Sequence, residues 1–132
     1  MRDPLLEENS LTFASIHSAI ELYQYAMGYN FKVMPVEHRM QVLRDYHTAL
    51  SVEQAELLNE VSWKPWRSIE SQKPNPDMDK VALEWIDCFI FLIDQALCLG
   101  LSSEAIEKAF EAKLNTLQVR IDNGYSKVNT QT

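Results

Sequence analysis

The chain has 132 residues, 46% of them hydrophobic, and a formal net charge of −7. This length and composition indicate one globular domain with its own core and argue against a disordered chain. The negative charge argues against binding to nucleic acid or to an anionic membrane, because both reward an excess of Lys and Arg. A phosphate substrate remains compatible with this charge if local cations or a metal ion offset it.

The first two predicted helices cover residues 10–27 and 35–62. The sequence contains only 3 glycines and few alternating apolar runs, which favours an all-α fold. The first helix has Asn9 or Ser10 as its cap and ends at Gly28. Its apolar stripe consists of Leu11, Ile16, Ile20, Tyr23 and Met27. Pro35 opens the second helix, whose stripe consists of Val36, Met40, Leu43, His47, Leu50, Leu57 and Val61.

The third predicted helix starts at Asp77 or Asp79 and stops at Gly100, and the fourth runs from a serine cap at 102 or 103 to about residue 123. The third helix is apolar nearly all round, so we expect it in the middle of a bundle. It is too short, and contains too many aspartates, to be predicted as a membrane span. Its two cysteines, ten residues apart on one helix, cannot form a disulfide with each other. Reduced cysteines and the lack of a secretion signal predict a cytoplasmic protein.

Two pairs of carboxylates lie on the two central helices. Glu53 lies on the apolar stripe of the second helix, and Glu56 follows on the same flank. Glu84 and Asp87 have the same spacing on the third helix. Counted from the connector, both pairs stand at nearly the same height in an antiparallel hairpin, roughly 8–9 Å from the loop. We therefore expect the two pairs to face each other in an apolar interior.

Carboxylates that converge in a core repel one another and are costly to bury unless a cation neutralises them. Oxygen ligands at positions i and i+3 on two helices suit Mg²⁺, or Mn²⁺ in its place, rather than zinc. No glutamate precedes any of the 3 histidines by three residues, which argues against a di-iron carboxylate bundle. The sequence therefore predicts a metal site with the ligands Glu53, Glu56, Glu84 and Asp87.

Two further acids have less certain assignments. Asp94 follows Asp87 by seven residues on the same helix face. It is predicted to be a further ligand, a base that orients water, or the partner of a buried tyrosine. Glu60 belongs either to the acidic site or to a solvated helix face. His47 is predicted to be a packed core residue rather than a ligand.

The connector after the second helix combines aromatic and cationic residues, and its prolines interrupt any helix. Lysine and arginine near the acidic site would offset phosphate charge. An indole face can stack on a nucleobase with about 1–3 kcal/mol. The alternative is that both tryptophans close the end of the bundle, a role that we expect for one of them. The residues concerned are Trp63, Lys64, Trp66 and Arg67.

The pattern Glu53-x-x-Glu56, followed after 27 residues by Glu84-x-x-Asp87, resembles the signature of the all-α nucleoside triphosphate pyrophosphohydrolases. That superfamily includes MazG-type enzymes and the dimeric dUTPases. The run ELLNEVSWKPW resembles the dUTPase-like branch, and KLNTLQVRIDNGY resembles its closing motif. The resemblance covers residues 36–125 and implies a four-to-five-helix bundle within one domain over residues 1–132, with a flexible tail over 126–132. The chain is about half the length of duplicated dimeric dUTPases, which implies a homodimer or homotetramer.

The resemblance implies a Mg²⁺-dependent hydrolase that splits a nucleoside triphosphate into the monophosphate and pyrophosphate. Glu53, Glu56, Glu84 and Asp87 would hold the metal, and Glu53 or Glu56 would take the proton of the attacking water. The implied substrate is dUTP, with a purine deoxynucleotide, dGTP or dATP, as the alternative that a phage-type pool-remodelling enzyme would use. The expected substrate contacts are Trp63, Lys64, Trp66, Arg67, Lys113, Asn115, Arg120 and Tyr125.

A different class of function is a non-enzymatic helical module that binds partner proteins through its apolar faces. The acidic quartet distinguishes the two classes, because such a module has no need of it. Metal binding would raise the melting temperature of the enzyme but not of the module. Metal storage or oxidation chemistry is a third possibility, but the chain lacks the histidines that it requires.

Overall fold

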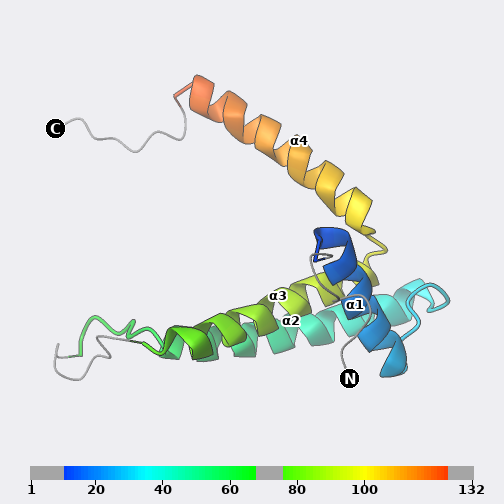
Figure 1. The fold of residues 1–132 in the computed structure, drawn as a ribbon, viewed down its shortest axis with the longest axis horizontal. Helices are drawn as coiled ribbons and strands as arrows, with labels where there is room; N and C mark the ends of the chain where they lie inside the picture. The colour runs from blue at the N-terminus through cyan, green and yellow to red at the C-terminus, as the bar shows by residue number, and fades with distance from the viewer. Residues whose placement is uncertain (1–10, 68–75, 125–132) are drawn as a thin grey trace. The chain divides into compact units, whose positions relative to one another are not determined.

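The computed structural model of the chain describes residues 11–67 and 76–124, and these contain four helices and no strand. The helices are α1 (Phe13–Ala26), α2 (Val36–Asn59), α3 (Met78–Cys98) and α4 (Ser103–Asp122), as Figure 1 shows. The predicted all-α fold is therefore confirmed. The chain divides into two compact units. One contains α1, α2 and α3 and ends at Gly100, and the other contains α4.

The helix ends are set by capping side chains. The side chain of Thr12 accepts a hydrogen bond from the Ser15 backbone N–H at 3.1 Å, and the Ser15 hydroxyl accepts one from the Thr12 N–H at 2.8 Å. This capping box starts α1 at Phe13 rather than at the predicted Asn9 or Ser10, which lie outside the described residues. Asp77 and Ser102 cap α3 and α4, and each is one of the two residues that the sequence offered for that cap.

Gly100 ends the α3 segment, as predicted. Its φ of +72° lies in the left-handed region, where glycine has no steric penalty. Among the described residues no single helix is long and apolar enough to cross a membrane. Helices α3 and α4 reach the length and apolar composition of a membrane span only when they are counted as one segment.

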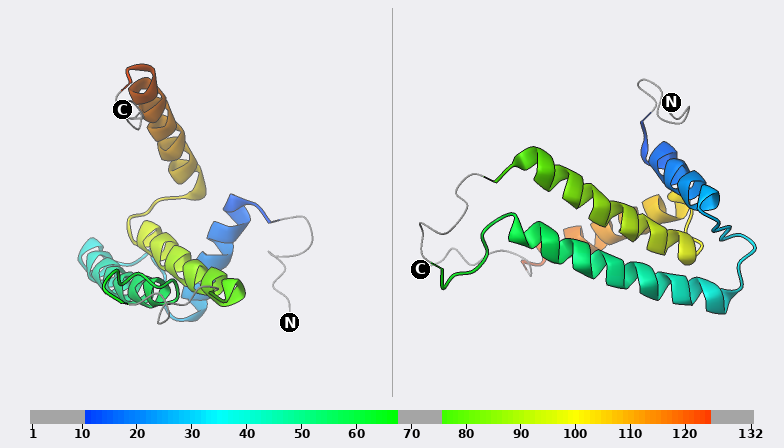
Figure 2. Two further views of the ribbon diagram at one scale, coloured as in Figure 1. Left: turned by 90° about the vertical axis from the view of Figure 1, so that its left-hand side faces the viewer. Right: turned by 90° about the horizontal axis from the view of Figure 1, so that it is seen from below.

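In the first unit, α2 and α3 pack side by side and α1 packs against α3, as the two views of Figure 2 show. The buried core gathers at one end of this hairpin, where the start of α2 meets the end of α3. Its members are Ile20, Phe31, Val42, Ile93, Leu97 and Cys98. The other end of the hairpin, which joins the connector, is less buried. It is this more open end that carries the two carboxylate pairs.

The apolar face predicted for α1 is not the face that is buried. Of its five residues only Ile20 is buried, whereas Tyr23 and Met27 are about 60% exposed. The face that is buried consists of His17, Ile20 and Gln24. Polar side chains therefore occupy two of the three inward positions, because α1 faces a polar partner on α3.

The prediction that α3 lies buried in the middle of a bundle is confirmed only for the second half of this helix. Ile93 and Leu97 are buried, but Leu83 and Trp85 are 69% and 55% exposed. The first half of α3 is therefore not in the middle of the described helices. The predicted burial of His47 on α2 is also wrong, because this side chain is exposed. Both cysteines are buried free thiols, as predicted.

Candidate active site

The hairpin of α2 and α3 brings the two carboxylate pairs together. The pKa of Glu53 is raised, first by burial and then by the negative charges of Glu56, Asp87 and Glu84. Glu56, Asp87 and Glu84 therefore all lie within electrostatic reach of Glu53. The expectation of an apolar interior is wrong for two of them, because Glu56 and Asp87 are exposed while Glu53 and Glu84 are half-buried. The quartet lies at the edge of the hairpin, where a solvated substrate can reach it.

Glu84 has an unsatisfied oxygen in this cluster. Its Oε2 atom is buried and has no hydrogen-bond partner in the described part of the chain. Nearby, burial and the charges of Glu53, Asp87 and Glu84 raise the pKa of the Cys88 thiol. Unpaired buried carboxylate oxygens are costly. A cation bound at this oxygen would offset that cost.

The donor chemistry of this cluster fits a hard divalent cation such as Mg²⁺, which takes carboxylate oxygens. The unpartnered oxygen of Glu84 and the raised pKa of Glu53 are both features that such an ion would relieve. As the side chains are placed, however, no group of three His, Cys, Asp or Glu within residues 11–67 and 76–124 is arranged to hold one ion. The chain thus supplies suitable ligand atoms, but these atoms do not surround a common point.

Glu60 is held by a lysine that the sequence analysis did not single out. Lys80 Nζ on α3 lies 3.1 Å from Glu60 Oε1, and the pKa of Lys80 is raised by this hydrogen bond, by the charge of Glu60 and by Glu84. The ion pair joins the ends of α2 and α3 beside the acidic quartet.

A pocket of about 700 Å³ adjoins the carboxylates. Helix α1 and helix α3 supply most of its wall, and Glu53 from α2 completes it. Asp87 lines the same pocket, as does Asp94 two helical turns further along α3, which corresponds to roughly 10 Å. Between these two acids the wall is apolar and aromatic. The contribution of α1 was missed in the sequence, where this helix matched no motif.

At the Asp94 end of the pocket, three polar side chains form a chain of hydrogen bonds. The hydroxyl of Tyr46 donates to Gln24 Oε1 at 2.7 Å, and Gln24 Nε2 donates to Asp94 Oδ1 at 3.0 Å. Asp94 is 0% exposed, and this burial raises its pKa to about 7, against the opposing effect of the Gln24 hydrogen bond. The closest of the three predicted roles is therefore partnership with a buried tyrosine, but it is exerted through Gln24. Gln24 was predictable only as the polar residue in phase with Ile20.

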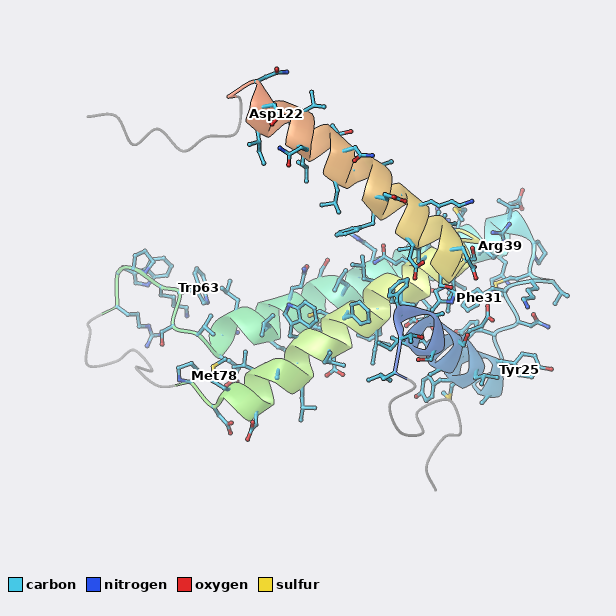
Figure 3. The ribbon with its side chains drawn as sticks, turned by 45° about the horizontal axis from the view of Figure 1, so that its top comes forward. Tyr25, Phe31, Arg39, Trp63, Met78 and Asp122 are labelled. Carbon is cyan, nitrogen blue, oxygen red and sulfur yellow. The ribbon has the colours of Figure 1, made fainter. Side chains whose placement is uncertain are left out.

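The tryptophan segment follows α2, and Figure 3 labels Trp63 there. Trp63 donates from Nε1 to Asn59 Oδ1 at 3.0 Å and meets the edge of Trp66 at a ring-centroid distance of 5.7 Å. Lys64 Nζ lies 5.8 Å from the Trp63 ring centroid. The two rings are 42% and 71% exposed, so they do not close the bundle end. They offer exposed aromatic surface, and contact between Trp63, Lys64, Trp66 or Arg67 and a substrate stays a prediction.

The remaining predicted contacts lie in the second unit. Lys113, Asn115 and Arg120 occupy exposed positions on α4, and Tyr125 lies outside the described residues. Lys113 and Arg120 are seven residues apart and share one face of α4, whereas Asn115 is rotated by about 200° from Lys113. The helix therefore presents the two cations together and the amide on another side. Their roles as substrate contacts stay predictions.

An all-helical chain with paired acids on a hairpin, next to a pocket large enough for a small molecule, has the features of a helical phosphate-ester or phosphoanhydride hydrolase. The family model described as dUTPase matches residues 29–130, and the chain belongs to this family. No curated protein and no solved structure matches the chain. Family membership identifies a dUTPase-like nucleoside triphosphate hydrolase. Helix α1, which lines the pocket, lies before the matched region.

Proposed function

We propose that the protein is a Mg²⁺-dependent pyrophosphohydrolase that converts dUTP into dUMP and pyrophosphate. The observation that carries this proposal is that Glu56, Glu84 and Asp87 all lie near Glu53, beside a pocket of about 700 Å³ that Glu53 and Asp87 line. Membership of the dUTPase family favours the uracil nucleotide. Mn²⁺ is expected to replace Mg²⁺, because both accept carboxylate oxygens.

The four carboxylates would hold the metal through their oxygens. Bound there, Mg²⁺ would offset phosphate charge and lower the pKa of a bound water. Glu84 contributes an oxygen that has no other partner in the described residues. Glu53 is the better candidate for the general base, because it is half-buried and lines the pocket. Glu56, which is exposed, remains the alternative base.

The chemical step is a hydrolysis in which atoms and charges balance. The oxygen of water forms a bond to phosphorus, the bridging bond between the α and β phosphates breaks, and pyrophosphate leaves with the bonding electrons. The proton of the water passes to the carboxylate base and then to solvent. Lys64, Arg67, Lys113 and Arg120 would offset the charge of the phosphate chain, and Asn115 and Tyr125 would contact sugar or phosphate. The exposed face of Trp63 or Trp66 would stack on the base.

We also propose that the protein is a homodimer or homotetramer in the cytoplasm. The support for assembly is the amount of large apolar surface on α3 that its own unit leaves uncovered. Leu83, Trp85 and Leu92 on this helix are each more than half exposed. Such surface on one helix is typical of an interface.

The test of the function is hydrolysis of each common deoxynucleoside triphosphate in Mg²⁺, with the monophosphate and pyrophosphate identified as products. We expect dUTP to have the highest kcat/KM. Preference for dGTP or dATP would instead identify the purine enzyme. Glu53→Gln should abolish turnover, and Asp45→Asn, an exposed change on the same helix, should not. Absence of turnover with every nucleotide, together with no change in melting temperature on adding Mn²⁺, would identify a non-enzymatic module instead.

A further inference from the structure

The chemistry proposed above makes no use of the Asp94 end of the pocket. Asp94 is 0% exposed and lines the pocket that Glu53 and Asp87 also line. Its Oδ1 atom accepts a hydrogen bond from Gln24, whereas its Oδ2 atom is buried without a partner in the described part of the chain. Buried polar atoms are nearly always paired. A buried acceptor without a partner in a pocket wall therefore points to a group that a ligand supplies.

The hydrogen-bond chain determines which Asp94 oxygen is left for that ligand. The hydroxyl of Tyr46 donates to Gln24 Oε1, so the amide nitrogen of Gln24 is turned towards Asp94 and donates to Oδ1. Tyr46 is itself held between aromatic rings, with centroid distances of 6.5 Å to Tyr29 and 5.9 Å to Phe91. The orientation of the carboxyl group is thus fixed by side chains of α1 and α2. Oδ2 is left as the carboxyl oxygen without a partner among the described residues.

The dimensions of the pocket match a nucleoside held between its two polar ends. Asp87 lies at the acidic site and Asp94 lies two turns along α3, roughly 10 Å away. Phe89, Ile90 and Ile20 contribute apolar wall between them. A ligand with phosphates at the Asp87 end, and a flat ring with a polar edge at the Asp94 end, would fit this pocket.

We propose that Asp94 is a specificity-determining residue, whose Oδ2 accepts a hydrogen bond from the ring N–H on the edge of the substrate's nucleobase. Gln24 and Tyr46 are positioning residues that act through it. For dUTP this donor is the N3–H of uracil. The inference rests on the proposed function, because the base reaches Asp94 only when the triphosphate lies at the acidic quartet. It replaces the stacking of the base on Trp63 or Trp66, because those residues follow α2 at the opposite end of the hairpin. Burial raises the pKa of Asp94 to about 7, so a ligand N–H that compensates its charge stabilises the ionised acceptor near neutral pH.

The test compares dUTP with N3-methyl-dUTP, in which a methyl group replaces the N3 hydrogen, and the variants separate the lost hydrogen bond from the added bulk. The wild-type protein should prefer dUTP by about tenfold to a hundredfold in kcat/KM, the range of a hydrogen bond to a charged group. Asp94→Asn keeps the shape and replaces the free acceptor with an amide donor, so the ratio should fall to within about threefold of unity. Tyr46→Phe should reduce the ratio by a smaller factor. Asp45→Asn on α2 is exposed and should leave it unchanged.

Binding of α,β-imido-dUTP and its N3-methyl form, measured by calorimetry, separates this inference from the proposed hydrolysis. If the wild type binds α,β-imido-dUTP more tightly than its N3-methyl form but hydrolyses no nucleotide, the proposed hydrolase is wrong and the role of Asp94 stands. Turnover with equal kcat/KM for the two nucleotides would keep the hydrolase and overturn the role of Asp94. If Asp94→Asn does not fold, the ratio in Tyr46→Phe decides this point, and an unchanged ratio there would overturn the role of Asp94. An unchanged ratio in folded Asp94→Asn would equally overturn it.

Discussion

Replacement of Asp94 by Asn should remove a large pH dependence of stability. Burial raises the pKa of this carboxyl from its ordinary value of 3.8 to about 7 in the folded protein. Below about pH 4 both the folded and the unfolded states hold the proton, so the group makes no difference. Between about pH 4 and 7 the unfolded chain releases the proton while the folded protein retains it, and folding becomes less favourable as pH rises. Above about pH 7 the full penalty is present.

The size of this effect follows from the difference between the two pKa values. Each unit of difference corresponds to about 1.4 kcal/mol, so a fully buried Asp94 costs about 4 kcal/mol of folding free energy at pH 8. Asn is neutral at every pH and can still accept the hydrogen bond from Gln24. Asp94→Asn should therefore match the wild type near pH 4 and exceed its free energy of unfolding by about 4 kcal/mol near pH 8.

The assay is urea unfolding of both proteins in steps from about pH 4 to pH 8, followed by circular dichroism at constant protein concentration. The difference between the two curves isolates Asp94 from the other carboxylates, which titrate in both proteins. Asp45→Asn is the matched control, because Asp45 is exposed. A constant difference between Asp94→Asn and wild type across this range would refute the reasoning, since it would mean that Asp94 titrates alike in the folded and unfolded states.

Two further predictions concern the metal and the assembly. Glu84→Gln should raise the melting temperature in metal-free buffer, because it removes one of the crowded negative charges. It should also abolish the rise in melting temperature that Mn²⁺ produces in the wild type. An equal rise in both proteins would exclude Glu84 as a ligand. Sedimentation should give twice or four times the chain mass, and Leu83→Glu on the exposed face of α3 should shift it towards the monomer; a wild-type monomer would contradict the proposed interface.

Much of the local structure could be predicted from short-range patterns. The caps at Asp77 and Ser102 and the stop at Gly100 depend on neighbouring backbone groups, so sequence spacing was enough to place them. The opposition of the two acidic pairs also followed, because an antiparallel hairpin fixes relative heights by helical rise. Burial was harder to predict. The exposure of Asp87 and of the first half of α3 depends on how far α1 extends over α3.

The sequence by itself determined the four helices, the family and the meeting of Glu53 and Glu56 with Glu84 and Asp87, because each rests on spacing within or between adjacent helices. Only the tertiary structure decided that Gln24 meets Asp94, 70 residues further along the chain, and that α1 completes the pocket. Such pairings depend on the rotation of one helix against another. An error of one residue in the phase of α1 turns the predicted face by about 100°, which is enough to move Tyr23 outward and Gln24 inward.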